Sequence, residues 1–408
     1  MKQDEIPCLA EVGLSGEIGD DQVPRHRPEL RTNRGRGVGM SVGLQAKPVG
    51  SFLPVRRIAY DDVRLITGKP LQENRADQPP MSRIHIITTG ARLHFGLMSY
   101  RPPRGREFGG AGLMIDSPSS VVAVSAHAAD LVTAPSAEIG SRAEQFLSAY
   151  RSRCPAKFQP PPCHVAVRTA IPAHSGLGSG TQLALAVAQG LALLGGDASA
   201  DPVTLAHRVG RGLRSALGIH GFGNGGFLLD GGKTTEECIG ALEARAEFPA
   251  SWRLVLITPP GETGLSDSAE RDAFAGLPPM PIETTRELRR LGLAVLLPAV
   301  IAADFEAAGA ALFEFGRVAG DYFSFAQGGT YANATLGRLV DHLREQGHRG
   351  VAQSSWGPTL AVLCRDVHSA NTLVGDLAVS ESWSCCQTRV ATALNTGARI
   401  ESVEADRA

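Results

Sequence analysis

A glycine-rich segment at residues 171–182, IPAHSGLGSGTQ, has the residue types of a phosphate-binding loop. It follows a strand expected at 164–169 and opens an apolar helix expected at 177–194. Glycines let the backbone approach a ligand closely, and the first N–H groups of a helix are unpaired and favour an anion. The residues that carry these groups are Gly176, Gly178, Ser179, Gly180 and Thr181. We therefore predict that this segment binds phosphate.

The segment differs from two common phosphate-binding motifs. It does not end in Gly-Lys-Ser/Thr, so it is not a Walker A loop. No acidic residue ends a second strand about 20 residues later, as a dinucleotide-binding unit requires. A glycine-rich turn without a ligand is the plain alternative, but three glycines and two hydroxyl groups are more than a turn requires.

The elements that must position this loop follow an α+β pattern. Strands are expected at 83–89, 112–115, 120–125, 164–169, 226–230, 253–258, 359–364 and 384–390. Helices are expected at 141–152, 177–194, 202–217, 284–297, 299–319, 331–346 and 367–378. The chain is expected to end as a small lobe of sheet and helix.

Composition narrows the class of protein. The 408 residues suffice for two domains, and the net charge of −1 indicates no nucleic-acid partner. No apolar run reaches the roughly 18–20 residues of a membrane span, and the first residues do not resemble a signal peptide. The seven scattered cysteines are typical of reduced thiols, so we expect a cytoplasmic protein without a membrane partner.

Residues 1–80 differ from the rest of the chain. They contain RTNRGRGVGMSVG and QENRADQPP, with many Gly, Arg and Pro residues and little apolar periodicity. We expect disorder or a loosely packed extension here. Met81 directly precedes the first clear strand, and the hypothesis that it is the true start can be checked by mass spectrometry of the native N-terminus.

Three segments, in order, resemble the motifs of the GHMP kinases. TGARLHFGL at 89–97 resembles the first motif, IPAHSGLGSGTQLALA at 171–186 resembles the second, which binds the phosphates of ATP, and VAQSSWGPTLAVL at 351–363 resembles the third. The resemblance implies a two-lobed α+β fold. A ribosomal S5-like N-terminal lobe would occupy 81–250 and a ferredoxin-like C-terminal lobe 251–408, and a homodimer would be the expected assembly.

Shorter strings resemble one branch of this superfamily, the β-ribofuranosylaminobenzene 5'-phosphate synthases of methanopterin biosynthesis. These strings are ARLHFGL at 91–97, GTQ at 180–182, GRGLRS at 210–215, HGF at 220–222, GGF at 225–227, DGG at 230–232, QGG at 327–329 and QSSWGP at 353–358. The resemblance implies that phosphoribosyl diphosphate reacts with 4-aminobenzoate, releasing diphosphate and carbon dioxide. It further implies Mg²⁺ and no organic cofactor, and 4-hydroxybenzoate would meet the same electronic demand.

The chain departs from the kinase members in three places. Kinases often have a catalytic Asp in a Gly-x-Asp setting, where this chain has Gly218-Ile219-His220. The helix at 183–194 has no acidic residue for magnesium, and the first motif has no Lys. Because a kinase needs a base and a metal clamp, we interpret these changes as a phosphate-bearing substrate without phosphoryl transfer.

The implied reaction suggests roles for residues near the first two motifs. Arg92 and His94 follow the first strand and are expected to touch a substrate anion, with a core histidine as the alternative for His94. His174 is expected to donate to the departing diphosphate. Arg211 and Arg214 lie three apart in the helix expected at 202–217, so they would share one face and bind the 5'-phosphate or the carboxylate. A solvated charged face is the alternative for this pair.

Two further residues are candidates for the chemistry at C1 of the ribose. His220 stands at the position of the kinase acid and is expected beside C1. Asp230, which ends a strand, is the first choice for Mg²⁺ or for stabilising positive charge on the ribose, with a turn residue as the alternative. Ser179 is the other candidate metal ligand.

The third motif is expected to pack on the phosphate loop and to bind substrate. Its candidate residues are Ser354, Ser355, Trp356 and Gly357. Trp356 could stack on the benzoate ring, and a core tryptophan is the alternative. Phe323 and Phe325 are expected to fill the core rather than line an aromatic pocket.

Two other functions remain open from the sequence. The first is an ATP-dependent small-molecule kinase of the same fold, which would consume ATP with a sugar or alcohol. The second is a non-catalytic regulator that binds a phosphorylated sugar, which would show binding without turnover.

Overall fold

The computed structural model describes residues 83–261, 264 and 267–404. All of these belong to the compact unit Asn74–Ala408. The predicted extension at 1–80 and the proposed start at Met81 lie outside the described residues. Within the described part of the chain, no helix has the length and apolar character needed to cross a membrane.

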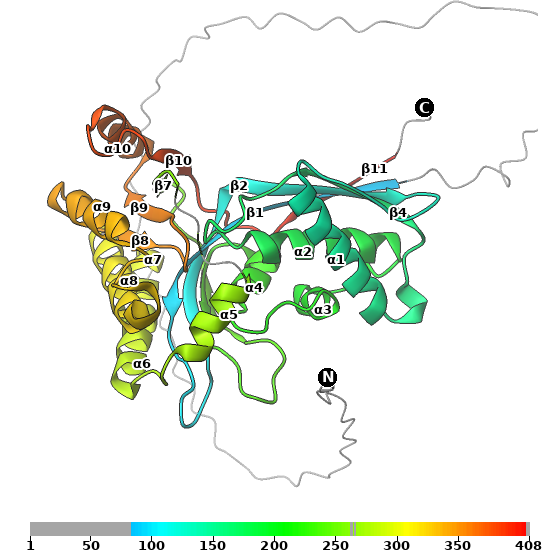
Figure 1. The fold of residues 1–408 in the computed structure, drawn as a ribbon, viewed down its shortest axis with the longest axis horizontal. Coiled ribbons are helices and arrows are strands. Elements are labelled where there is room, and N and C mark those ends of the chain that lie inside the picture. The colour runs from blue at the N-terminus through cyan, green and yellow to red at the C-terminus, as the bar shows by residue number, and fades with distance from the viewer. Residues whose placement is uncertain (1–82, 262–263, 265–266, 405–408) are drawn as a thin grey trace, which may run out of the picture. The chain divides into compact units, whose positions relative to one another are not determined.

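In the described chain, short runs of strands are separated by runs of helices (Figure 1). The strands are β1 Arg83–Leu97, β2 Gly110–Ala126, β3 Leu131–Thr133, β4 Cys163–Thr169, β5 Phe227–Asp230, β6 Leu242–Ala246, β7 Arg253–Thr258, β8 Val351–Gln353, β9 Leu360–Cys364, β10 Gln387–Ala391 and β11 Arg399–Glu404. The α-helices are α1 Ala137–Arg153, α2 Ser179–Leu194, α3 Pro202–Arg208, α4 Leu217–Asn224, α5 Asp267–Gly276, α6 Ile282–Arg289, α7 Leu297–Ile301, α8 Phe305–Gln327, α9 Ala334–Glu345 and α10 Val367–Val379. A 3₁₀ turn, η1 Ala156–Phe158, and a π-helical turn, η2 Arg290–Leu296, complete the list.

The larger sheet has the order β11-β1-β2-β4-β3, and β5 and β6 extend it from the other half of β2. β1 and β2 form a long antiparallel pair from Ile84↔Ser125 to Leu97↔Gly110. The register shifts between His94 and Gly96, and such a bulge redirects side chains beside it. The first motif, residues 89–97, forms the C-terminal part of β1 in this pair.

Helix α2 packs directly on this sheet, and α1 and α3 pack beside it (Figure 1). The residues of α2 from Gln182 to Ala192 are buried, as its apolar sequence predicts for an internal helix. A Cβ atom at Gly190 would lie 2.4 Å from Cγ2 of Val124, so this glycine permits the close approach of α2 to β2. This packing holds the N-terminal end of α2, where the phosphate loop enters.

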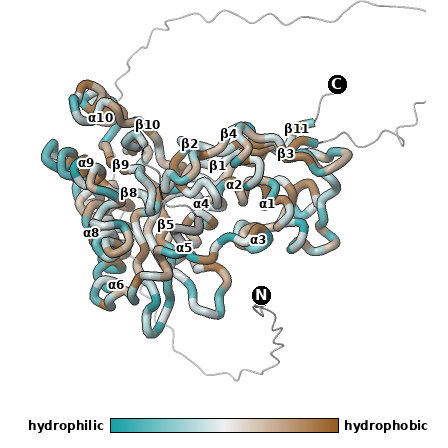
Figure 2. Tube along the Cα trace, in the orientation of Figure 1, coloured by the Kyte–Doolittle hydropathy of each residue, from teal (hydrophilic) through white to brown (hydrophobic). Residues whose placement is uncertain are grey.

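The smaller sheet has the order β10-β7-β9-β8 and is covered on both faces. Leu254 and Leu256 of β7 belong to the core shared with α8, whereas Val255 and Ile257 face the core formed by α9 and α10. Successive strand residues point to opposite faces, so β7 is apolar throughout. The hydropathy colouring shows hydrophobic segments along the strands of both sheets, with hydrophilic stretches at the outer turns (Figure 2).

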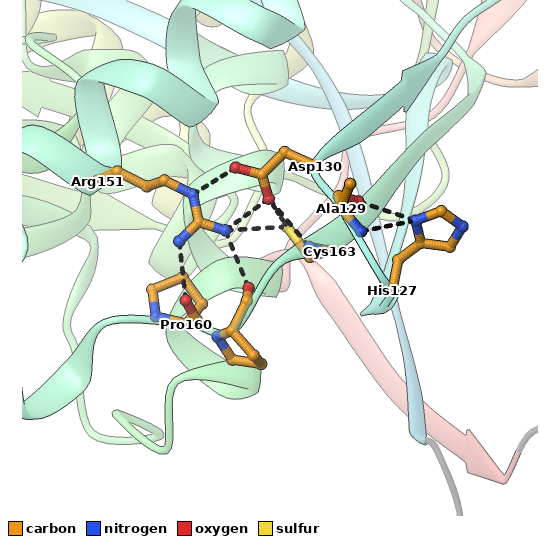
Figure 3. A network of polar contacts seen from close by, with 7 residues as sticks. His127, Ala129, Asp130, Arg151, Pro160 and Cys163 are labelled. Carbon is orange, nitrogen blue, oxygen red and sulfur yellow. Dashed lines mark hydrogen bonds and ion pairs between the residues drawn. The ribbon is translucent and has the colours of Figure 1, made fainter.

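A network of polar contacts holds the C-terminal half of α1 against β4 (Figure 3). The Arg151 guanidinium donates to both carboxylate oxygens of Asp130, at 2.7 and 2.8 Å, and to the carbonyl oxygen of Pro160 at 2.8 Å. Asp130 also accepts from the backbone N–H of Cys163 at 3.0 Å. These contacts orient α1 relative to the sheet, and so orient the residues on its first turns.

Several predicted elements differ from the structure. The strands expected at 112–115 and 120–125 are one strand, β2. The helix expected at 202–217 ends at Arg208, because Gly210 and Gly212 have φ values of 66° and 91° that do not continue a helix. The helix expected at 299–319 is interrupted before Phe305, where Asp304 caps a new helix by accepting from the N–H of Ala307.

The C-terminal end of the described chain returns to the larger sheet. β11 pairs antiparallel with β1, from Arg83↔Glu404 to Thr88↔Arg399. Residue pattern does not predict this strand, because all six of its residues are exposed and show no alternation of buried positions. The division of the chain at 250/251 stays a prediction.

Candidate active site

A cavity of about 480 Å³ opens where the phosphate loop, β1, the 209–216 loop, α5, α8 and the third motif meet. Most of the residues predicted for the site line it. These are Arg92, His94, His174, Gly176, Gly178, Ser179, Gly180, Thr181, Arg211, Arg214, Ser355, Trp356 and Gly357. His220, Asp230 and Ser354 do not line it.

The phosphate loop has the geometry that its glycines predict. Gly178 is the residue before α2 and has a φ of 74°, a left-handed conformation that favours glycine. The guanidinium of Arg92 lies against this glycine, since a Cβ atom there would be 3.2 Å from Arg92 Nε. The backbone N–H of Arg92 donates to the carbonyl of Leu177 at 3.0 Å. The first motif therefore packs directly beneath the phosphate loop.

The third motif holds the loop from the other side. The Ser354 hydroxyl donates to the carbonyl of Gly176 at 2.8 Å and accepts from the N–H of His94 at 3.1 Å. Ser354 is completely buried, so the prediction that it binds substrate is corrected: it joins the three motifs. A Cβ atom at Gly357 would lie 2.4 Å from the nitrogen of Gly176, so neither backbone leaves room for a side chain.

Among the described residues that line the cavity are four arginines, and the sequence motifs did not indicate one of them. Arg142 projects from α1, and its Nη2 lies 2.6 Å from where a Cβ atom of Gly180 would be. Arg211 Nη2 lies 3.3 Å from the same point. Arg211 and Arg214 are on an irregular loop rather than on one helix face, and that prediction is wrong because the helix ends at Arg208. The break lets the two side chains reach different parts of the cavity.

Aromatic side chains line the cavity away from the phosphate loop. The ring of Trp356 lies 5.4 Å from that of Phe274 and 4.9 Å from that of Phe323, in edge-to-face arrangements. The Arg214 guanidinium stacks over Phe274 at 4.6 Å. Phe323 was predicted as core, yet it also lines the cavity, whereas Phe325 is 85% exposed and the core prediction for it is wrong.

No Asp or Glu is among the described residues that line the cavity. Arg92, Arg142, Arg211 and Arg214 line it instead, together with the start of α2, and guanidinium groups and a helix N-terminus both attract a multiply charged anion. Arg142 and Phe274 could not have been found from local motifs, because each comes from a helix without a recognisable string. Their place in the cavity lining becomes visible only in the tertiary structure.

His94 lies in this positive surrounding and is 6% exposed. Burial, together with the charges of Arg92 and Arg214, holds the pKa of His94 well below its usual value of 6.5. The imidazole is therefore neutral at neutral pH and adds no positive charge to the cavity.

The low pKa of His94 makes stability depend on pH. Below pH 6.5 the unfolded chain binds a proton that the folded His94 does not, so the free energy of unfolding falls as pH falls below that value, by up to roughly 1.4 kcal/mol per pH unit. We expect His94→Gln to reduce this acid loss between pH 6.5 and 5. Urea unfolding at each pH measures it, with His368→Gln at an exposed site as the control. An unchanged pH slope in His94→Gln would contradict this assignment.

Asp230 and His220 are not where the sequence analysis expected them. Asp230 is fully buried, and its carboxylate accepts from the N–H of Ala216 at 2.6 Å, the hydroxyl of Ser215 at 3.2 Å and the N–H of Gly232 at 2.8 Å. The ring of His220 bonds to the carbonyl of Gly240 at 2.8 Å. The predicted contacts of both residues with substrate are therefore corrected, and Asp230 instead closes the 209–216 loop onto β5.

Asp230→Asn should destabilise the protein rather than weaken metal binding. Every group around the carboxylate is a donor, so an amide NH₂ would face a donor and leave it unsatisfied, at about 2–3 kcal/mol. Urea unfolding measures the loss, and the exposed Asp376→Asn is the control. Wild-type stability combined with a weakened magnesium dependence would instead restore Asp230 as a metal ligand.

The fold and the loop place the chain among proteins with the GHMP-kinase fold. The family model of the GHMP kinases N-terminal domain matches residues 141–225, which include the phosphate loop. A homoserine kinase from Cytophaga hutchinsonii superimposes with a TM-score of 0.59 over 79% of this chain and 99% of its own, at 15% identity. A mevalonate-3-kinase from Thermoplasma acidophilum superimposes with a TM-score of 0.53 over 78% and 98%, at 13% identity. At these identities the likeness shows the fold alone.

Curated relatives identify the branch. The β-ribofuranosylphenol 5'-phosphate synthase of Methanothermobacter thermautotrophicus is 31% identical over 67% of this chain and 87% of the relative. The protein of the same name from Archaeoglobus fulgidus is 28% identical over 77% and 99%. The chain belongs to the β-ribofuranosylphenol 5'-phosphate synthase family. The α+β GHMP-kinase-like fold and the synthase resemblance predicted from the motifs are thus confirmed.

Proposed function

We propose that this protein joins phosphoribosyl diphosphate to 4-aminobenzoate or 4-hydroxybenzoate, for tetrahydromethanopterin biosynthesis in the cytoplasm. C1 of the ribose bonds to the ring carbon that bears the carboxylate. The bond from C1 to diphosphate breaks with its electrons on diphosphate, and the carboxylate leaves as carbon dioxide with its bonding electrons returned to the ring. A ribofuranosylphenol 5'-phosphate, the product in the relatives' names, is what 4-hydroxybenzoate would yield.

One observation carries the proposal: a single cavity combines a glycine-rich loop surrounded by arginine side chains with an aromatic wall. The donor substrate needs several cationic groups for its phosphates, and the cavity around the loop offers Arg92, Arg142 and Arg211 with the start of α2. The acceptor needs an apolar surface for its ring and a cation for its carboxylate. Trp356, Phe323 and the Arg214–Phe274 stack meet that need.

The charge of the cavity also suits the departure of diphosphate. Arginines around the loop stabilise the negative charge that grows on the leaving group, and preorganised charges act most strongly in such sites. The described lining has no carboxylate to offset positive charge on the ribose, so the departing diphosphate itself provides the nearby negative charge. A neutral His94 avoids adding an opposing cation.

The described residues do not fit a resident magnesium site. They include no group of three or more His, Cys, Asp or Glu that could hold a metal, and Asp230 is fully engaged by donors. Magnesium usually binds through one or two carboxylates together with substrate phosphates. We therefore propose that Mg²⁺ enters as part of the phosphoribosyl diphosphate substrate.

A small-molecule kinase is the competing function. Kinase chemistry needs a base at the acceptor hydroxyl, and no described lining residue is an Asp or Glu. The test is an assay of the full chain with Mg²⁺, phosphoribosyl diphosphate and either carboxyl-labelled acid, with ATP and a panel of sugars and alcohols in parallel.

We expect labelled carbon dioxide that depends on phosphoribosyl diphosphate, with the faster acid identifying the natural acceptor. If neither acid releases labelled carbon dioxide and the protein consumes ATP with a sugar or alcohol, the protein is a small-molecule kinase instead. Tight binding of phosphoribosyl diphosphate without any turnover would support the regulator. Release of free ribose 5-phosphate without carbon dioxide would mean that diphosphate departs but the arene is not the acceptor.

A further inference from the structure

We propose that Arg142 is a diphosphate-binding residue, and that it and Arg211 hold the diphosphate over Gly180 from two sides. This inference rests on the proposed function, because it assigns one part of the cavity to one group of the donor substrate. The diphosphate would thus bind near Gly180, apart from Arg214, which stacks over Phe274 at the aromatic wall of the cavity.

Two guanidinium groups meet at one point beside the start of α2. A Cβ atom at Gly180 would lie 2.6 Å from Nη2 of Arg142 and 3.3 Å from Nη2 of Arg211. Gly180 is the second residue of α2, where backbone N–H groups lack a partner within the helix. Two cations brought this close repel each other, whereas an anion between them would be attracted to both and to the helix dipole.

Helix α1 places Arg142 there through its own periodicity. Residues four apart share one helix face, and Phe146, four residues after Arg142, is buried. The Arg211 guanidinium lies over the Phe146 ring at 4.8 Å. One face of α1 therefore supplies the first guanidinium and supports the second, although the two arginines are far apart in the sequence.

Titratable and charged groups of α1, the phosphate loop and the 209–216 loop lie around Arg142. The phosphate loop contributes His174, whose Nε2 lies 3.8 Å from Glu138, four residues before Arg142. The 209–216 loop contributes Arg211. No ion pair links Arg142 to an acidic residue in the described part of the chain, and Glu138 is not part of the cavity lining. A multiply charged oxyanion, such as diphosphate, fits two such guanidinium groups because each can fork onto phosphate oxygens.

The decisive experiment is titration calorimetry of the full chain with inorganic diphosphate, with and without Mg²⁺. We expect Arg142→Gln to weaken diphosphate binding about 10- to 100-fold, the effect of losing one or more hydrogen bonds to a charged group. Binding of 4-aminobenzoate or 4-hydroxybenzoate should change less than about 3-fold, because Arg142 meets the cavity at Gly180, whereas Arg214 is the arginine that stacks on the aromatic wall. Arg338→Gln, an exposed arginine on α9, is the matched control.

A second variant tests the geometry without removing the arginine. Gly180→Ala puts a methyl group where the tip of Arg142 lies, so the guanidinium must move. Alanine is favoured over glycine in a helix, so thermal stability should hold or rise while diphosphate affinity falls about 3- to 10-fold. A merely structural role for Arg142 would not give that combination.

The outcomes separate this inference from the proposed function. Unchanged diphosphate affinity in Arg142→Gln, or no diphosphate binding by the wild-type protein, would overturn the inference. Equal losses for diphosphate and the aryl acid would do the same, since they indicate general damage to the cavity. If the wild-type protein binds diphosphate through Arg142 but releases no labelled carbon dioxide from either acid, the inference stands and the proposed function fails.

Discussion

Gly176→Ala should abolish most synthase activity and destabilise the protein more than any other substitution of a loop glycine by alanine. Gly176 has a φ of 77°, and a Cβ atom there would lie 2.1 Å from the carbonyl oxygen of Ser354 and 2.9 Å from Cα of Gly357. Both contacts are backbone atoms, so no side-chain rotation relieves them. The phosphate loop and the third motif must separate.

The expected size follows from two separate costs. A left-handed conformation costs a non-glycine residue about 1–2 kcal/mol, and forced overpacking adds about 1–3 kcal/mol. A displacement of about 1 Å in a positioned substrate can lower activity about 100-fold, so we expect at least that loss in kcat/KM for phosphoribosyl diphosphate. Urea unfolding and the carbon dioxide assay measure the two effects.

Gly196→Ala is the matched control. Gly196 has a φ of 78°, nearly that of Gly176, but no atom lies within 4 Å of its Cβ position. It should therefore show only the conformational cost and nearly normal kcat/KM. Equal effects at the two glycines would show that the contact between the loop and the third motif is unimportant.

Arg214→Gln should raise the KM for the aryl acid about 100-fold and leave the KM for phosphoribosyl diphosphate within about 3-fold. The guanidinium stacks over Phe274 beside Trp356, where it can fork onto the carboxylate of a ring held against the aromatic wall. Losing two hydrogen bonds to a charged group costs about 3 kcal/mol, which sets this magnitude.

Arg214→Lys should fall between the wild-type protein and Arg214→Gln, because lysine keeps the charge but loses the planar fork and the stacking. Arg338→Gln on the exposed face of α9 controls for loss of a surface charge. The opposite pattern, a raised KM for phosphoribosyl diphosphate alone, would move Arg214 to the phosphate part of the cavity. Together with Arg142→Gln, this variant tests whether the cavity has two separate anion-binding parts.

Several parts of the site could be predicted because they depend on local sequence. The phosphate loop was found from glycines between a strand and an apolar helix, and the helix start follows from Gly178 and the buried stretch of α2. The third motif was correctly expected to pack on the loop, and Gly357 shows why, since it has no room for a side chain. Such features need only backbone conformation and periodicity.

Other parts of the site were misassigned because the same local sequence is compatible with two structural environments. A polar residue at the end of a strand can face a cavity or bind neighbouring backbone groups, and Asp230 does the latter by accepting from Ala216 and Gly232. Arg211 and Arg214 have helical spacing, but two glycines with positive φ end the helix before them. Phe323 and Phe325 are two residues apart, and only the packing of α8 decides that Phe323 is buried and Phe325 is exposed.

The sequence by itself determined the glycine-rich loop before α2, the order of the three motifs, the α+β fold and the branch of the superfamily, since these depend on residue type and spacing along one chain. The tertiary structure alone decided which side chains share the cavity. Arg142 on α1 meets Arg211 at Gly180, and Phe274 on α5 meets Trp356, only because helices distant in sequence pack around one loop. Contacts between distant segments depend on how whole elements pack, and no local pattern records them.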